Sequence, residues 1–264
     1  MKKSLEISKS RKVMIFIFLF LLLVTSFLLK VDIGLSLKED KLNETYLSNE
    51  LIAHAPIHID DDSDFIEFPG LGSFDDPYII ENYNITSDVE SCGINISATA
   101  KFFIIRNCFI DALDFGIWIS WISEGTAQVI NNTCVNHYST GIDLWDAPGA
   151  ILSNNKLHHN RNGIYCVISD SIRLENNNCT NNQLKGVSVR FCDNAIIENN
   201  YCSENEIGIE TFFSRNFNIT SNQVTLNTKG IQAFNVLSAT VSKNIISKNT
   251  GNGIIIEESM SVSL

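Results

Sequence analysis

The sequence predicts an all-β protein, a single-stranded parallel β-helix of about eight coils, because one short pattern recurs at a nearly constant period. From residue 93 onward, a glycine opens a segment of alternating apolar residues every 22 to 25 residues. Two further apolar-alternating stretches follow in each period, and no helical periodicity is visible after residue 53. Helical repeats, including leucine-rich repeats, are therefore excluded. The repeating glycines are Gly93, Gly116, Gly141, Gly163, Gly186, Gly208, Gly230 and Gly253.

Three short strands are expected in each coil when residues are counted from the glycine as position 0. Positions 1 and 3 form the first strand, for example Ile117 and Ile119, Ile142 and Leu144, Ile164 and Cys166, and Val187 and Val189. Positions 9 and 11 form the second, with Phe102 and Ile104, Ala150 and Leu152, Ile172 and Leu174, Ala195 and Ile197, Phe217 and Ile219, and Ala239 and Val241. Position 16 adds a third inward column of Phe109, Leu157, Cys179, Cys202, Val224 and Ile246. Cys134 joins this column if the 25-residue coil carries its two extra residues near Ser123 to Thr126.

Position 14 holds an asparagine in most coils, and Asn132 is equivalent once the two extra residues of its 25-residue coil are allowed for. Asparagine tolerates left-handed backbone geometry at a tight corner, and stacked asparagines can bond to the amides above and below them. We therefore predict a buried structural ladder rather than a polar ligand site. Its expected members are Asn107, Asn132, Asn155, Asn177, Asn200, Asn222 and Asn244.

The chain has seven cysteines, which in an exported protein raise the question of disulfides. Cys134, Cys179 and Cys202 share a column with Phe, Leu, Val and Ile, so we expect them to be core residues. Cys179 and Cys202 would stack in neighbouring coils, which leaves an oxidised pair open as an alternative.

The N-terminal 29 residues have the pattern of a signal peptide or a signal anchor. Five basic residues precede an apolar run from Val13 to Leu29. The run does not distinguish between cleavage and retention as a membrane anchor, and in both cases the rest of the chain is expected to be exported. Residues 30–52 have no sustained period and are expected to be a linker.

Residues 53–92 contain two apolar-alternating pieces and are expected to be strands that cap the N-terminal end of the β-helix. The acidic run of Asp60, Asp61, Asp62 and Asp64 suggests calcium, but it lacks the spacing of a calcium loop, and a solvated turn is the favoured interpretation. Residues 93–264 are the repeats, and the last coil is incomplete and uncapped. The sequence is therefore expected to be either a fragment or a chain that self-associates at this coil.

The composition is acidic, with a formal net charge of −11. Phosphate binding requires clusters of Lys and Arg, so a nucleic-acid partner is not expected.

The Gly-Ile-x-Ile and Ile-x-x-Asn-Asn columns, together with the entry segment from Ala55 to Cys108, resemble the right-handed β-helix family called NosD-like or CASH repeats. The resemblance covers roughly residues 54–264. The entry segment is similar to the start of exported or surface β-helix proteins of archaeal type. It implies a right-handed, pectate-lyase-like solenoid. It implies little about activity, because this fold hosts lyases, hydrolases, epimerases, adhesins and accessory proteins.

The outward positions 2 and 4 of the first strand form the candidate binding face. Aromatic side chains beside charged ones suit a sugar chain, because rings stack on C–H groups and charges bind hydroxyls. The alternative is a face covered by turns or by another subunit. The candidate residues are Trp118, Asp143, Trp145, Tyr165, Arg190, Glu210, Phe212 and Phe234.

Catalysis and metal binding are the weaker hypotheses. A glycosidase needs two carboxyl groups within about 9.5 Å, and only Asp143 and Asp146, with Arg190 two coils away, could approach this arrangement. The family name implies a role in copper binding, and the one local histidine cluster that could bind a metal is His137, His158 and His159. We favour the interpretation that these histidines are polar turn residues. No cofactor is expected.

These observations predict an exported β-helix protein that binds carbohydrate or another surface polymer without catalysis. The alternatives are a polysaccharide lyase or glycosidase, a structural or adhesion protein, and a copper-accessory protein.

Overall fold

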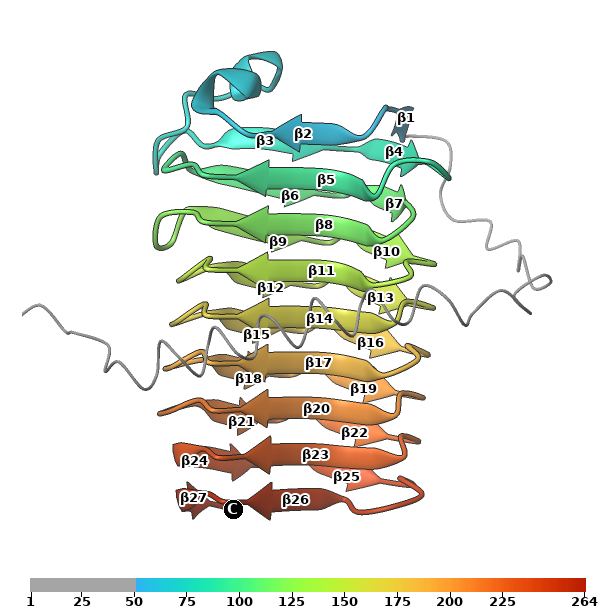
Figure 1. Ribbon diagram of the computed structural model, residues 1–264, viewed down its shortest axis with the longest axis vertical. Coiled ribbons are helices and arrows are strands. Elements are labelled where there is room, and N and C mark those ends of the chain that lie inside the picture. The colour runs from blue at the N-terminus through green and yellow to red at the C-terminus, as the bar shows by residue number, and fades with distance from the viewer. Residues whose placement is uncertain (1–50) are drawn as a thin grey trace, which may run out of the picture. The chain divides into compact units, whose positions relative to one another are not determined.

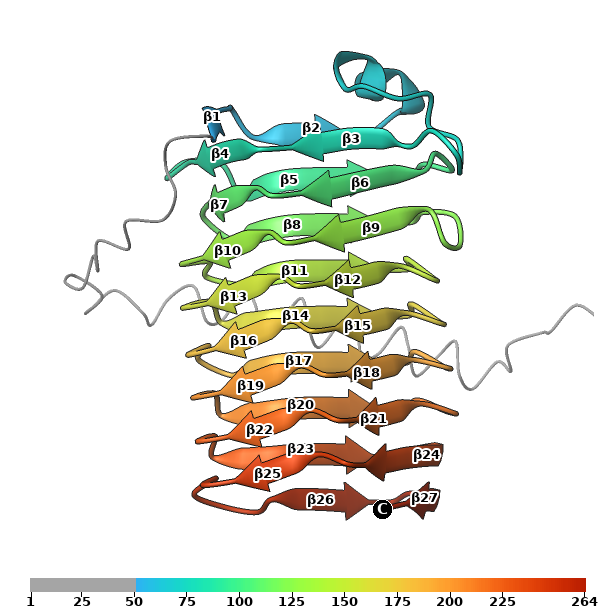
Figure 2. The same cartoon turned by 180° about the vertical axis from the view of Figure 1, so that it is seen from behind.

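The computed structural model describes residues 51–264, which form a parallel β-solenoid of about eight turns with three long sheets and one short helix (Figures 1 and 2). Successive coils are paired in parallel, so the prediction of an all-β parallel β-helix is confirmed. The predicted signal segment and nearly all of the predicted linker lie outside the described residues. Among residues 51–264, no helix is long and apolar enough to cross a membrane.

Each sheet contains nine strands. Sheet A contains β1 (Ile52–Ala53), β4 (Tyr83–Thr86), β7 (Phe109–Asp111), β10 (Thr133–Val135), β13 (Lys156–His158), β16 (Asn178–Thr180), β19 (Tyr201–Ser203), β22 (Gln223–Thr225) and β25 (Ile245–Ser247). Sheet B contains β2 (Ile57–Ile59), β5 (Cys92–Ser97), β8 (Phe115–Ser120), β11 (Thr140–Trp145), β14 (Asn162–Val167), β17 (Lys185–Arg190), β20 (Ile207–Phe212), β23 (Lys229–Phe234) and β26 (Ile254–Glu257). Sheet C contains β3 (Tyr78–Glu81), β6 (Phe103–Arg106), β9 (Ala127–Ile130), β12 (Ile151–Ser153), β15 (Arg173–Glu175), β18 (Ile196–Glu198), β21 (Asn218–Thr220), β24 (Leu237–Ser242) and β27 (Met260–Ser263).

The core is one continuous cluster between the three sheets. From the second glycine repeat to the seventh, the residues at positions 1 and 3 are buried, and they pair in register from strand to strand, as Ile142 pairs with Ile164. In the 25-residue coil, Val129 pairs with Leu152 and Cys134 with Leu157, so the two extra residues precede Ala127, as predicted.

The first glycine coil has a different register from the predicted one. Phe103, Ile105 and Ile110 are buried there, whereas Phe102, Ile104 and Phe109 are only partly buried. The extra residue of this coil lies before Phe103 rather than after Phe109, and a shift of one residue reverses the face on which each side chain of a strand lies.

The segment expected to be a separate cap is the first coil of the solenoid. β2, β3 and β4 pair in parallel with β5, β6 and β7, so the three sheets begin before Gly93. Between β2 and β3, the 3-10 helix η1 (Asp62–Glu67) brings the buried Phe65 against Tyr78, with ring centroids 4.6 Å apart. The end of the core is therefore covered by one aromatic side chain and the short helix that carries it.

The aspartates near η1 have structural partners. Asp61 and Asp64 form a capping box at the start of η1. Asp60 accepts hydrogen bonds from Asn95 and Ser97, and Asp62 accepts one from Thr99. Each aspartate of the acidic run therefore has a structural partner.

The asparagine ladder follows the corner between sheets C and A. Asn200 is representative: its Nδ2 donates to Leu174 O at 2.9 Å and to Asn222 Oδ1 at 3.0 Å, and its Oδ1 accepts from the backbone N–H and the Nδ2 of Asn177. Asn107 lies outside this ladder, because Cys108 occupies its slot and donates its backbone N–H to Asn132 Oδ1. The ladder members are Asn132, Asn155, Asn177, Asn200, Asn222 and Asn244.

A second asparagine ladder, which the sequence analysis did not predict, follows the corner between sheets A and B. Its members, Asn160, Asn182, Asn205, Asn227 and Asn249, make the same contacts as those of the first ladder. His137 heads this ladder and donates its backbone N–H to Asn160 Oδ1. The two ladders satisfy the polar groups of both corners from one coil to the next.

The glycine column is explained by close approach between coils. A Cβ added to Gly163 would lie 2.5 Å from the carbonyl oxygen of Gly186, closer than real contacts allow. All seven cysteines are buried free thiols, including Cys179 and Cys202, which are paired neighbours in sheet A.

Candidate functional site

The candidate face lies on the outside of sheet B, where the residues at position 2 form one row across the coils. Trp118, Asp143 and Tyr165 pair directly on β8, β11 and β14, and Ser188 and Glu210 continue the row on β17 and β20. A second row carries Trp145, Val167, Arg190, Phe212 and Phe234. The structure therefore brings all eight predicted binding residues onto one sheet.

An ion cluster occupies the middle of this face. Glu210 Oε2 accepts from Arg190 Nη2 at 2.6 Å and from Ser188 Oγ at 2.8 Å, and Lys185 Nζ lies 2.9 Å from the same oxygen. Burial by itself raises the pKa of Glu210, but the charges of Lys185 and Arg190 outweigh it and hold that pKa below its ordinary value. Arg190 and Glu210 are predicted members of the binding face, whereas Lys185 was missed, although it directly precedes Gly186 and so begins the same strand.

The phenylalanines beyond this cluster pack on one another. The rings of Phe212 and Phe234 are stacked with centroids 5.1 Å apart, and the Arg190 guanidinium lies 5.3 Å from the Phe212 centroid. Because Arg190 and Phe234 come from the coils on either side, both faces of the Phe212 ring are covered. Phe213 and Phe191 extend the group, with centroids 5.5 Å apart. Ring faces are what a sugar needs, so this end of the face is a poor platform.

The other end of the face is less covered: Phe115 stacks on one side of the Trp118 ring, with centroids 5.2 Å apart, and the Arg190 guanidinium lies over one side of the Tyr165 ring. Trp118, Trp145 and Tyr165 are partly exposed, and they surround Asp143, which is 8% exposed. Burial raises the pKa of Asp143 to about 7, and the nearby Thr140 hydroxyl opposes the shift. No residue in 51–264 forms an ion pair with Asp143. Burial also raises the pKa of Tyr165 to about 12, against the effect of Arg190, which lies 5.5 Å from its ring centroid.

Asp146 and Asp143 differ in solvent exposure. It lies in the turn after β11, is exposed, and has a left-handed φ of 51°. Its carboxyl group is therefore solvated, whereas that of Asp143 is enclosed. Glu210 lies three coils from Asp143, or about 14 Å at the usual strand spacing. The described face offers no evident pair of matched catalytic carboxyl groups.

The three predicted histidines are not arranged as a metal site. His137 is buried in the second ladder, its Nδ1 lies 2.7 Å from Ala112 O, and burial lowers its pKa to about 4. His158 is partly exposed and its neighbour His159 is exposed, their Nδ1 atoms are 2.8 Å apart, and Asn181 contacts His159. Within residues 51–264, no group of three or more His, Cys, Asp or Glu side chains could hold a metal ion.

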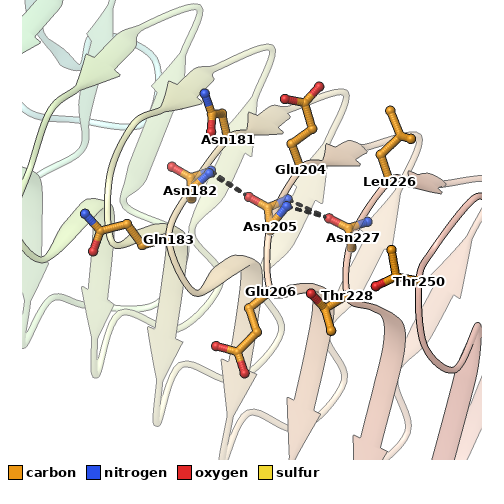
Figure 3. A pocket seen from close by; sticks show the side chains of 10 residues that line it. All are labelled: Asn181, Asn182, Gln183, Glu204, Asn205, Glu206, Leu226, Asn227, Thr228 and Thr250. Carbon is orange, nitrogen blue, oxygen red and sulfur yellow. Dashed lines mark hydrogen bonds between the residues drawn. The ribbon is translucent and has the colours of Figure 1, made fainter. Parts of the chain in front are cut away.

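A shallow pocket of about 450 Å³ lies at the corner between sheets A and B. Figure 3 shows Glu204 and Glu206 on opposite sides of its floor, which is formed by Asn182, Asn205 and Asn227. The amide groups of these asparagines bond to one another and to backbone carbonyls. The floor therefore has little hydrogen-bonding capacity left for a ligand.

Comparison with known proteins agrees with the fold. The family model described as "Right handed beta helix region" matches residues 140–263, in agreement with the predicted right-handed sense of the coils. No curated protein sequence matched the chain.

Two epimerases are among the similar solved structures. The periplasmic alginate epimerase AlgG is 22% identical with a TM-score of 0.58, and the match covers 65% of this chain and 45% of AlgG. The A-module of the mannuronan C-5 epimerase AlgE6 from Azotobacter vinelandii is 12% identical with a TM-score of 0.43, over 70% of this chain and 73% of the module. The chain thus spans less than half of AlgG, and at this identity the similarity concerns the fold.

Proposed function

We propose that this protein is exported and binds a polysaccharide on the outer face of sheet B, between β8 and β14. The observation that carries the proposal is the group of three partly exposed aromatic residues, Trp118, Trp145 and Tyr165, around the enclosed Asp143. Aromatic walls with a few polar groups are typical of ligand sites. The similarity in fold to AlgG, a periplasmic enzyme named for its action on alginate, supports both the ligand class and the location.

The geometry favours a repeating polymer over a compact ligand. Equivalent positions on neighbouring coils are separated by about 4.8 Å along one straight line. A polymer lying along the solenoid axis would meet Trp118, Asp143 and Tyr165 in turn, one on each coil. The ion cluster of Lys185, Arg190 and Glu210 then forms one end of the binding region, since the Phe212 ring beyond it is covered.

A second candidate function is catalysis on the same polymer. A carboxyl group that titrates near neutral pH is suited to general acid–base work, and Asp143 has this property. Asp146 is exposed and Glu210 is already paired with two cations, so we place a single proton-transfer step at Asp143 rather than a two-carboxylate hydrolysis.

The test is binding of the wild-type protein and two variants to polysaccharides of known composition. Affinity electrophoresis in gels containing alginate, polygalacturonate, mannan or soluble cellulose derivatives will show retardation by at least one polymer. Trp118→Ala and Trp145→Ala will each weaken binding by roughly 2- to 10-fold, the equivalent of one aromatic contact. Trp121→Ala is the matched control, because Trp121 is 60% exposed and follows β8 outside the face.

Two results would overturn the proposal. One is the absence of binding to every polymer tested, which would favour a structural or adhesion role. The other is equal loss of binding in the Trp121 control, which would place the contact elsewhere. Depolymerisation or a change in uronate stereochemistry that is lost in Asp143→Asn would support the catalytic candidate.

A further inference from the structure

Asp143 has no evident structural reason to be an acid. It lies on the outer face, yet its side chain is 92% removed from solvent, since only 8% remains exposed. Burying a carboxyl group without a counter-charge costs free energy that an apolar residue or an asparagine would not require. The other carboxylate of this face, Glu210, has two cations and a hydroxyl group as partners. Within the described residues, Asp143 has no cation as a partner, and the Thr140 hydroxyl offsets only part of the same cost.

The elements packed against Asp143 provide no other group that changes charge near neutral pH. β8 has no titratable side chain, and β11 has none besides Asp143. β14 contributes Tyr165, whose pKa is raised to about 12, and Cys166, whose pKa burial raises well above its ordinary value. Asp146, in the turn after β11, is the charged residue closest in sequence and is exposed, whereas Lys185, Arg190 and Glu210 lie two and three coils away and are paired with one another. His58, on β2 in the same row, lies three coils from Asp143. Among the side chains of β8, β11 and β14, a change of charge between pH 6 and pH 8 is thus expected only at Asp143.

We propose that Asp143, in its protonated form, donates a hydrogen bond to an oxygen of the bound polysaccharide, and that ionisation of Asp143 releases the polymer. The inference rests on the proposed function and adds to it the recognition group and a pH dependence. A carboxylic acid is a donor only when protonated, and as an anion it repels hydroxyl and ring oxygens. Trp118 and Tyr165 occupy the directly paired positions one coil away on either side, so a ligand that reaches this carboxyl passes beside these two residues.

The pH dependence has a definite sign and size. If only the protonated form binds, Kd is constant in acid and rises tenfold per pH unit once Asp143 ionises. With the value of about 7 for the Asp143 pKa, Kd at pH 8 will be about tenfold higher than at pH 6.

The experiment measures Kd from pH 5 to pH 9 by affinity electrophoresis and by titration calorimetry, with whichever of the four polymers binds the wild-type protein. Asp143→Asn keeps a neutral donor of the same shape, so its Kd will be within a few-fold of the acidic wild-type value and flat across the range. Asp146→Asn is the matched control and will follow the wild-type profile, because Asp146 is exposed in the adjoining turn. Far-UV circular dichroism at each pH will show that the variants remain folded.

The outcomes separate this inference from the function on which it rests. No binding by the wild-type protein at pH 5 would overturn the proposed function. Binding that is unchanged from pH 6 to pH 8, or that falls equally in Asp143→Asn, would overturn the role of Asp143 and leave polysaccharide binding standing. A profile that is flat only in Asp143→Asn supports both.

Discussion

Removing one asparagine from the middle of the first ladder is expected to cost a large share of the stability of the protein. The Asn200 side chain is buried and makes four hydrogen bonds, two donated and two accepted. In Asn200→Ala, the carbonyl of Leu174 and the backbone N–H of Asn177 lose their ladder partner, whereas Asn222 Oδ1 keeps the backbone N–H of residue 200. Each orphaned buried group costs about 1–3 kcal/mol, so the expected loss is about 2–6 kcal/mol. This compares with a typical total of about 5–15 kcal/mol.

The assay is equilibrium urea denaturation followed by far-UV circular dichroism. Asn199→Gly is the matched control, because Asn199 is the exposed neighbour with a left-handed φ of 55°, which glycine also adopts, and its change should stay within about 0.5 kcal/mol. Asn244→Ala should cost less than Asn200→Ala, since Asn244 is only partly buried and is the last described member of the ladder. A loss of less than about 1 kcal/mol in Asn200→Ala would refute the view that the ladder satisfies otherwise stranded groups.

Two further predictions concern sheet B. Because burial raises the pKa of Asp143 from 3.8 to about 7, the folded state holds this proton more tightly, and the free energy of unfolding falls as pH rises from about 4 to 7. The full effect is on the order of 4 kcal/mol, so Asp143→Asn should unfold at a higher urea concentration than the wild-type protein at pH 8 but not at pH 4; an equal difference at both pH values would contradict this assignment. Gly163→Ala would bring Cβ within 2.5 Å of the Gly186 carbonyl and should lower stability by about 1–3 kcal/mol, whereas Gly253→Ala, with its nearest contact at 3.4 Å, should be close to neutral. Equal thermal shifts in the two variants would show that close approach between coils is not what requires glycine.

The repeat period predicted most of the fold, because residues one period apart in the sequence pair with each other when similar coils stack. The prediction was wrong where spacing alone does not locate an extra residue. In the first glycine coil, the Asn in "RNC" was assigned to the ladder, but Cys108 occupies the slot and Asn107 lies at the preceding position with a left-handed φ of 54°. The alternation Phe103, Ile105 was an available signal for the shifted register. The second ladder was also visible, as asparagines at position 19 in five successive coils.

The sequence predicted which residues lie on the candidate face, but not their side-chain contacts or their burial. Period-two alternation places Trp118, Asp143 and Tyr165 outside the core, and the structure shows them on adjacent strands. Spacing could not reveal that Phe212 lies between Arg190 and Phe234, or that Lys185 joins the ion pair of Glu210, since both depend on side-chain conformations across coils. The alternation of the sequence did not predict that Asp143 is buried either, because its burial depends on bulky neighbours on two other coils.

Bulky apolar residues adopt left-handed geometry more often in the turn that follows sheet B than at the other two corners, where Leu226 is such a residue. At the corner between sheets C and A, most left-handed positions are occupied by asparagine, as at Asn154, Asn176 and Asn199, for which this geometry costs little. At the corner after sheet B, φ values of 50° to 55° are imposed on the bulky apolar residues Ile168, Phe191 and Phe213, in the coils that follow Asp143. For such residues the left-handed region costs roughly 1–2 kcal/mol each, and asparagine would remove most of that cost.

The fold does not require these side chains, since Asn235 and Asp146 occupy equivalent places in other coils. An uncompensated carboxyl group on the face and strained apolar residues along its edge are two independent costs borne by the same sheet. Local inconsistencies of this kind concentrate at functional surfaces, because selection for binding tolerates a loss of stability that selection for folding alone would remove. Among the three outer faces of the described solenoid, sheet B is therefore the one at which a ligand should be sought first.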